Sequence, residues 1–123
     1  MSGFSFDLDD TLFGPHGRDL CVIMAALKSA GHQVGILTAR PDVGRRIEEA
    51  EVRSLGCPEP DFWLDASQMN EDEFDRSLRP ATRDEALYDF KLREIRDRDL
   101  THFDDRARIL HRRDPSAKLL RPY

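Results

Sequence analysis

The sequence lacks long apolar runs and has few cysteines. None of its 123 residues belongs to a stretch approaching the roughly 18 apolar residues of a membrane span. The first residues also lack the basic region and apolar stretch of a secretory signal. We therefore expect a soluble, cytoplasmic protein with no membrane partner. The two cysteines, Cys21 and Cys57, have no CxxC motif or Cys/His cluster around them. This favours neither a disulfide framework nor a zinc site, and we expect both as small buried apolar residues.

Basic residues are missing from one part of the chain. Residues 59–75 contain no Lys or Arg but hold seven acids: Glu59, Asp61, Asp65, Glu71, Asp72, Glu73 and Asp75. The other 17 acids are balanced by 19 Lys and Arg residues. The net charge of −5 therefore does not exclude a phosphate-rich partner.

Internal repeats and low-complexity tracts are also absent, and the length suits one domain spanning residues 1–123. Alternation of Phe4, Phe6 and Leu8 with polar residues predicts a strand that ends at Asp9. Further short strands are predicted over 34–38, 61–64, 100–103 and 117–120.

Helical spacing of apolar residues predicts helices over 20–30, 41–55, 82–97 and 107–111, the first two ending at Gly31 and Gly56. The second helix would bury Val43, Ile47, Ala50 and Leu55. Thr82 followed by Glu85 has the pattern of a capping box. Alternatively, Asp89 caps a second, shorter helix just before Lys91. The polar segment 65–79 is expected to be a loop or a short irregular helix.

Strands that alternate with helices predict an α/β fold, with a parallel sheet covered on both faces. Ligands of such sheets bind at the carboxyl ends of the strands. The polar residues expected there are Asp7 and Asp9 after the first strand, Thr38 after the second, Asp104 and Asp105 after the fourth, and Lys91 from the preceding helix.

This set of residues indicates phosphoryl transfer. Asp7 can attack phosphorus to form an aspartyl-phosphate, while Asp9 can protonate the leaving oxygen and then activate water. Mg²⁺ would relieve the repulsion between carboxylates, held by Asp7, the backbone carbonyl of Asp9, and Asp104. Thr38 and Lys91 would hold the phosphate oxygens.

Four motifs in order carry a family resemblance. "DLDDT" fits the DxDxT signature of the haloacid dehalogenase (HAD) superfamily, "ILTAR" carries the Thr of the second motif, "FK" the Lys of the third, and "FDDR" the paired acids of the fourth. The resemblance covers residues 4 to about 120. It implies a three-layer Rossmann-like HAD core, an Mg²⁺-dependent phosphatase, and metal ligands at Asp7, Asp9, Asp104 and Asp105, although Asp105 could instead support the site or cap a helix.

No segment is long enough for a cap domain, so an open, capless site is expected. Among capless relatives, the motifs most resemble the phosphatase domains of polynucleotide kinase-phosphatases. Arg40 and Arg106 match arginines in two of these motifs, which implies that they contact the substrate phosphate. This implies 3′-phosphate ends of nucleic acid, or nucleotides, as substrates. The chain has no kinase P-loop, so a kinase or ligase partner would be a separate protein.

Simpler interpretations stand beside these roles. Asp7 and Asp9 could be solvated loop acids, Thr38 could cap the helix that Pro41 opens, and Lys91 could be a solvated surface residue. Asp10 is expected to face away from the site as a turn residue. The four histidines, His16, His32, His102 and His111, lie outside the motifs and show no ligand spacing. Alternative functions are a phosphoserine protein phosphatase of the capless type and a non-catalytic binding module.

Overall fold

Five parallel strands form one sheet in the computed structural model, which describes residues 3–122. Their order in the sheet is β3-β2-β1-β4-β5. The strands are β1 (Gly3–Phe6), β2 (Gln33–Leu37), β3 (Phe62–Leu64), β4 (Leu100–Phe103) and β5 (Lys118–Leu120). The strand order reverses at β1, which pairs with both β2 and β4. Such a reversal is where open parallel sheets place their ligand sites.

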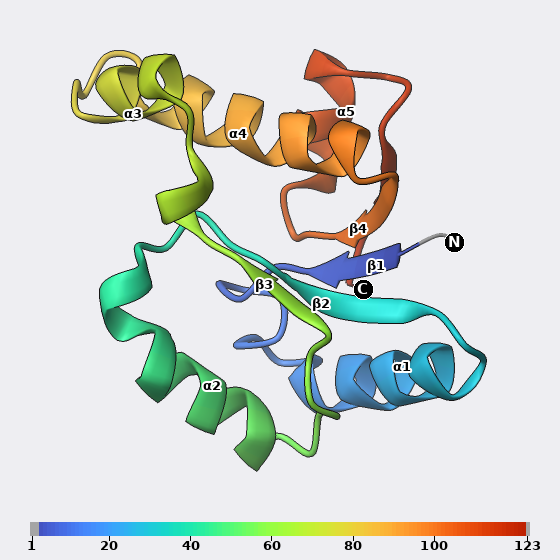
Figure 1. The fold of residues 1–123 in the computed structure, drawn as a ribbon. Coiled ribbons are helices and arrows are strands. Elements are labelled where there is room, and N and C mark those ends of the chain that lie inside the picture. Colours follow the sequence, from blue (N-terminus) through green and yellow to red (C-terminus); the bar gives the residue numbers. More distant parts are fainter. Residues whose placement is uncertain (1–2, 123) are drawn as a thin grey trace.

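Helices cover both faces of the sheet (Figure 1). α1 (Gly17–Ser29) and α2 (Arg45–Ser54) lie on one face, while α4 (Arg83–Asp97) and α5 (Ala107–Arg113) lie on the other. α3 (Glu71–Ser77) packs against α4, and two short 3₁₀ helices, η1 (Asp42–Gly44) and η2 (Ala66–Gln68), complete the described elements. This confirms the predicted α/β architecture with a parallel sheet between helical layers. Across residues 3–122, every helix is too short or too polar to traverse a bilayer.

Two apolar clusters hold the layers together. One lies between the sheet and α1 and α2, where Phe6 and Phe103 stack with ring centroids 4.5 Å apart. The other lies beneath α4 and contains Leu37, Phe90 and Ile95. Because side chains alternate along a strand, the residues of β1 and β4 that do not enter the first cluster face α4.

The helix boundaries mostly agree with the predictions. Gly31 and Gly56 follow α1 and α2 with φ values of +94° and +91°, as the predicted helix ends require. α4 is continuous, so the alternative of a break at Asp89 is wrong. The predicted capping box at Thr82 is also wrong, because the Thr82 hydroxyl donates to the carbonyl of Arg76 instead of capping α4.

The acidic segment is more ordered than expected. It forms η2 and the regular helix α3, whose N-terminus has a capping box between Asn70 and Glu73. The Asn70 side chain accepts from the Glu73 N–H at 2.8 Å, and the Glu73 carboxylate accepts from the Asn70 N–H at 3.0 Å. In the described chain, η2 and α3 are the only helices between β3 and α4.

The predicted apolar face of α2 is wrong at Val43, Ile47 and Ala50, whereas Leu55 is partly buried against the first apolar cluster. Val43 and Ile47 are 89% and 69% exposed, while the buried residues of α2 are Glu48 and Val52. The helix begins at Arg45 rather than near Pro41, and the Glu48 carboxylate pairs with the Arg40 guanidinium. That ion pair lets a charged residue occupy an inward position that the hydrophobic pattern assigned elsewhere.

The two cysteines form a disulfide between α1 and the segment after α2. The expectation that they are buried is confirmed, at 2% and 8% exposure for Cys21 and Cys57, but the expectation that they are unpaired is wrong. A separation of 36 residues gave no sign of their proximity, because it arises only when α1 and α2 pack on the same face of the sheet. Disulfides are rare in a reducing cytosol, so this bond does not support the cytoplasmic expectation.

Candidate functional site

The ends of β1 and β4 bring two buried carboxylates together. Phe6 is in register with Phe103, and the next residues, Asp7 and Asp104, continue the ladder, since the Asp7 N–H donates to the Phe103 carbonyl at 2.9 Å. Asp7 is 4% exposed and Asp104 is fully buried. The strand itself ends at Phe6, however, and not at Asp9 as predicted. The chain therefore turns immediately after the first acid.

Lys91 of α4 bridges these two acids. Its Nζ lies 2.7 Å from Oδ2 of Asp104 and 3.1 Å from Oδ1 of Asp7. The side chain of Lys91 is only 9% exposed, so the interpretation as a solvated surface lysine is wrong. Burial opposes its charge, but the two carboxylates outweigh burial and raise the pKa of Lys91.

Asp7, Asp104 and Asp105 form an acidic trio. Each offers a carboxylate oxygen, and these atoms lie within 4.8 Å of one another. Among the described residues, Lys91 is the one cation that pairs with this trio, so three potential negative charges face one positive charge. Burial, aided by the neighbouring acids, raises the pKa of Asp7 to about 7 against the opposing effect of Lys91. Burial and Asp104 likewise raise the pKa of Asp105. A divalent cation would remove this imbalance.

Asp9 lies outside this trio in the described structure. Its side chain is 59% exposed and accepts from Arg40, with the Nε of Arg40 at 3.1 and 3.2 Å from the two carboxylate oxygens. The hydrogen bonds from Arg40 lower the pKa of Asp9 despite partial burial. Asp9 lines the same cleft as Asp7, but its carboxylate is not part of the acidic trio.

Arg40 is itself held by two acids. Besides Asp9, its Nη1 donates to Oε2 of the buried Glu48 at 3.1 Å. Its guanidinium carbon lies 5.3 Å from the centroid of the Phe13 ring. The predicted phosphate contact of Arg40 would therefore compete with the existing pair to Asp9.

Thr38 directly follows β2 at the same edge of the sheet. It is fully buried, its N–H donates to the Leu64 carbonyl at 2.9 Å, and its Oγ1 accepts from the Arg40 N–H at 3.1 Å. It does not cap a helix, because Pro41 occupies the cap position of η1. The hydroxyl hydrogen has no assigned acceptor among the hydrogen bonds of residues 3–122.

These groups surround a cleft of about 240 Å³. It is lined by Asp7, Asp9, Asp10, Ala39, Arg83, Asp84, Leu87, Tyr88, Lys91, Asp105 and Arg106. Thr38 and Arg40 are not among these lining residues of the described chain. Asp10 is, so the expectation that it faces away from the site is wrong. It is exposed, and its φ of 57° places it in a left-handed turn conformation.

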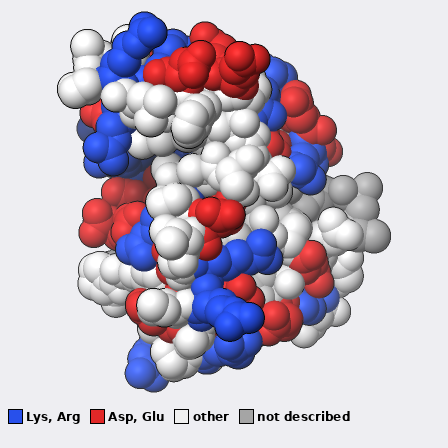
Figure 2. Space-filling model, turned by 60° about the vertical axis from the view of Figure 1, so that its left-hand side comes forward, with Lys and Arg blue, Asp and Glu red and all other residues white. Residues whose placement is uncertain are grey.

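Arg106 reaches the cleft from the loop between β4 and α5. Its Nη1 donates to the hydroxyl of Tyr88 at 2.7 Å, and its guanidinium carbon lies 5.9 Å from the centre of that ring. Arg83, an exposed cation at the start of α4, lines the cleft as well. Lys and Arg alternate with Asp and Glu over the face in Figure 2, and no region of one sign covers it.

Sequence reasoning missed three residues around the site. Tyr88 precedes Lys91 by three residues, which places both on one helix face, so the predicted helix could have indicated it, whereas the spacing of Arg83 gave no such signal. His102 is fully buried, and its Nε2 lies 2.9 Å from Oδ2 of Asp104. Its position two residues before Asp104, on the same side of a strand, was an available signal.

Comparisons of the chain with protein-family models, with curated proteins and with solved structures gave no match. The family resemblance therefore depends on the four motifs and on the arrangement described above.

Proposed function

We propose that this protein is an Mg²⁺-dependent phosphomonoester hydrolase of the HAD type that acts through an aspartyl-phosphate on Asp7. The observation that carries the proposal is the buried bridge from Lys91 to Asp7 and Asp104, with Asp105 beside it. The order of the motifs along the chain supports the same proposal. So does the segment between β3 and α4, which holds only two short helices in the described chain and is too short for a cap domain.

The donor set fits Mg²⁺. Carboxylate oxygens are the ligands that this hard cation prefers, and it is usually held by one or two of them with water and substrate phosphate. Asp7, Asp104 and Asp105 would hold the ion, with the backbone carbonyl of Asp9 as a further candidate. The bound ion would neutralise charge on the phosphate and on the acidic trio.

The chain's own residues would carry out two displacements. A carboxylate oxygen of Asp7 attacks phosphorus, the bond from phosphorus to the leaving oxygen breaks, and Asp9 gives that oxygen a proton. Water then attacks the phosphorus, Asp9 takes a proton from the water, and the bond between phosphorus and Asp7 breaks to release phosphate. Lys91 and the Thr38 hydroxyl would stabilise the charge that develops.

Asp9 can act as the acid of the first step only after its ion pair with Arg40 is broken. A carboxylate held by a guanidinium keeps a lowered pKa and is a poor acid. If Arg40 transfers its donors to the substrate phosphate, the pKa of Asp9 rises and the carboxyl can carry the proton that the leaving group needs. Arg40 would then link phosphate binding to proton transfer.

For the substrate, we propose a 3′-phosphorylated nucleic-acid end or a nucleotide. Tyr88 and Arg106 stand together at the cleft, and an aromatic ring beside a guanidinium suits a base and its phosphate. A panel of 3′-phosphorylated oligonucleotide, mononucleotide and phosphoserine peptide compares the candidates by kcat/KM. Preference for the peptide would favour the protein-phosphatase alternative.

The decisive test is hydrolysis of an aryl phosphate with Mg²⁺. Turnover should require Mg²⁺, stop on addition of a chelator, and disappear in Asp7→Asn. The matched control is Asp97→Asn, an acid at the exposed end of α4. Absence of turnover in the wild-type protein, or equal turnover in Asp7→Asn, would contradict the proposal and favour a non-catalytic binding module.

A further inference from the structure

A second pair of polar residues lies directly behind the acids of the cleft. Ser5 of β1 is in register with His102 of β4. Ser5 lies two residues before Asp7, and His102 lies two residues before Asp104. Side chains two residues apart in a strand share a face, so all four residues point towards α4. Ser5 and His102 are both fully buried.

Both nitrogens of the His102 ring have partners. Nδ1 lies 2.7 Å from the Ser5 hydroxyl, and Nε2 lies 2.9 Å from Oδ2 of Asp104. The Asp104 Oδ2 atom that faces Nε2 also accepts from the Lys91 ammonium at 2.7 Å, and an ammonium group can only donate. The other oxygen, Oδ1, accepts from the Arg106 N–H at 2.8 Å, so both oxygens of Asp104 act as acceptors.

These two contacts indicate where the protons lie. An oxygen that already accepts from Lys91 also accepts from Nε2–H of His102, which makes Nδ1 the acceptor nitrogen of the ring. The Ser5 hydroxyl must then donate to Nδ1. The chain of donors runs in one direction, from Ser5 through His102 to Asp104.

The remaining contacts of Asp104 show what this chain leaves free. Oδ2 accepts from both Lys91 and His102, at 2.7 and 2.9 Å. Oδ1 accepts from the Arg106 N–H at 2.8 Å. A carboxylate has about four acceptor positions, so about one remains, and it is on Oδ1.

We propose that Ser5 and His102 form a positioning pair that orients the Asp104 carboxylate so that Oδ1 is presented to a divalent cation. The inference depends on the metal site of the proposed function and adds to it two residues that touch neither cation nor substrate. Hydrogen-bond partners of ligating groups determine their orientation, and removing one typically costs about 10–100-fold in metal affinity or activity.

The test measures Mg²⁺ affinity by calorimetry, without substrate, in three variants. His102→Phe keeps a ring but loses both hydrogen bonds, and affinity should fall about 10–100-fold. His102→Gln keeps a donor near the position of Nε2 and should recover most of the lost affinity. His32→Phe is the control, because this histidine lies before β2, at the opposite edge of the sheet, in ring contact with Phe4.

A second readout needs neither metal nor activity. Nitrogen NMR of the metal-free protein should show the neutral His102 ring protonated at Nε2. In Ser5→Ala, a nearly isosteric change, Nε2 should stay protonated while Nδ1 loses its donor and its nitrogen resonance shifts, and Mg²⁺ affinity should fall by less than in His102→Phe. Ser5→Ala decides the question if His102→Phe does not fold.

The outcomes separate the inference from the proposed function. Equal Mg²⁺ affinity in the folded His102→Phe variant and in wild type, or an Nδ1–H tautomer in wild type, would overturn the positioning role alone. Failure of wild type to bind Mg²⁺ would overturn the metal site and the positioning role with it. Binding of Mg²⁺ without hydrolysis of any phosphate ester would contradict the proposed function and leave the positioning role intact.

Discussion

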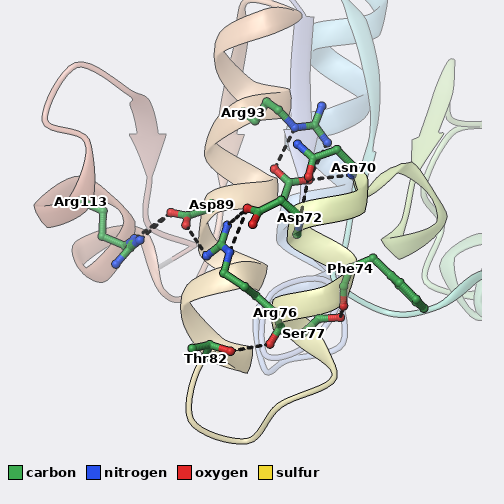
Figure 3. Close-up of polar contacts among 10 residues, drawn as sticks. Asn70, Asp72, Phe74, Arg76, Ser77, Thr82, Asp89, Arg93 and Arg113 are labelled. Carbon is green, nitrogen blue, oxygen red and sulfur yellow. Dashed lines mark hydrogen bonds and ion pairs between the residues drawn. The ribbon is translucent and has the colours of Figure 1, made fainter.

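Two groups of acids flank α4, and the protein compensates them differently. On the outer side, between α3, α4 and α5, three acids meet three arginines (Figure 3). The pairs are Asp72 with Arg76, Glu73 with Arg93, and Asp89 with both Arg76 and Arg113. In the acidic trio at the cleft, three acids share one paired cation among the described residues, Lys91. The number of acids is equal, but the balance of charge is not.

The pKa values follow this difference. The pKa values of Glu73 and Asp89 are lowered, because their arginine partners outweigh the effect of burial. In the trio, the pKa values of Asp7 and Asp105 are raised, because burial and neighbouring acids outweigh Lys91, while the pKa of Asp104 is lowered, because His102 and Lys91 outweigh its burial. Unbalanced buried charge is a common property of functional sites. The outer group instead ties helices together.

The largest expected effect comes from removing Lys91, the cation that pairs with the acidic trio. Lys91→Met leaves the buried carboxylates of Asp7 and Asp104 without the cation that pairs with them, so we expect a loss of about 3–5 kcal/mol in unfolding free energy without metal. Turnover should fall about 10²–10³-fold. Mg²⁺ should restore part of the stability. Urea unfolding with and without Mg²⁺ measures this, and equal stability of wild type and variant would contradict the uncompensated charge.

The same type of change in the outer group provides the comparison. Arg76→Met removes a cation whose side chain is 26% exposed and whose partners keep access to solvent or to Arg113. We expect a smaller loss of stability, no response to Mg²⁺ and unchanged turnover. A loss as large as that of Lys91→Met would abolish the distinction between the two groups.

The next change is at the rim of the cleft, where Asp9 has its own cation. Asp9→Asn should lower kcat about 10²–10⁴-fold, because the leaving oxygen loses its proton donor. Mg²⁺ affinity should stay near the wild-type value, because the Asp9 carboxylate lies outside the trio and its backbone carbonyl is retained. Unchanged turnover would remove Asp9 from the proposed chemistry, and lost Mg²⁺ binding would place its carboxylate at the metal.

Much of the fold could be predicted from local pattern. The order of strands and helices follows from periodicity, and parallel strands place their carboxyl ends at one edge. Asp7, Thr38 and Asp104 therefore had to lie near each other once the strands were recognised. Lys91 was predicted from the third motif, while its place on a charged helix had left a solvated surface residue open as the alternative.

The parts that failed depend on contacts between distant segments. The strand predicted to end at Asp9 ends at Phe6, because an alternating pattern does not show where a ladder ends. Glu48 of α2 is buried because Arg40 pairs with it from the loop between β2 and η1. The outer acids looked uncompensated because their partners Arg76, Arg93 and Arg113 lie beyond the acidic segment in sequence.

The smallest effect is expected from neutralising one buried acid of the outer group. Glu73→Gln keeps an acceptor for the Asn70 N–H but loses the charge that pairs with Arg93 at 2.8 Å, so we expect a loss of roughly 1.5–3 kcal/mol at pH 7. Since the folded-state pKa of Glu73 lies below its usual value of 4.5, the stabilisation is complete above that pH and is lost as the pH falls through the lowered pKa. Urea unfolding of wild type and variant across this range should show the difference shrinking towards acid, while turnover at pH 7 stays unchanged. A difference independent of pH would mean that packing, not charge, makes Glu73 important.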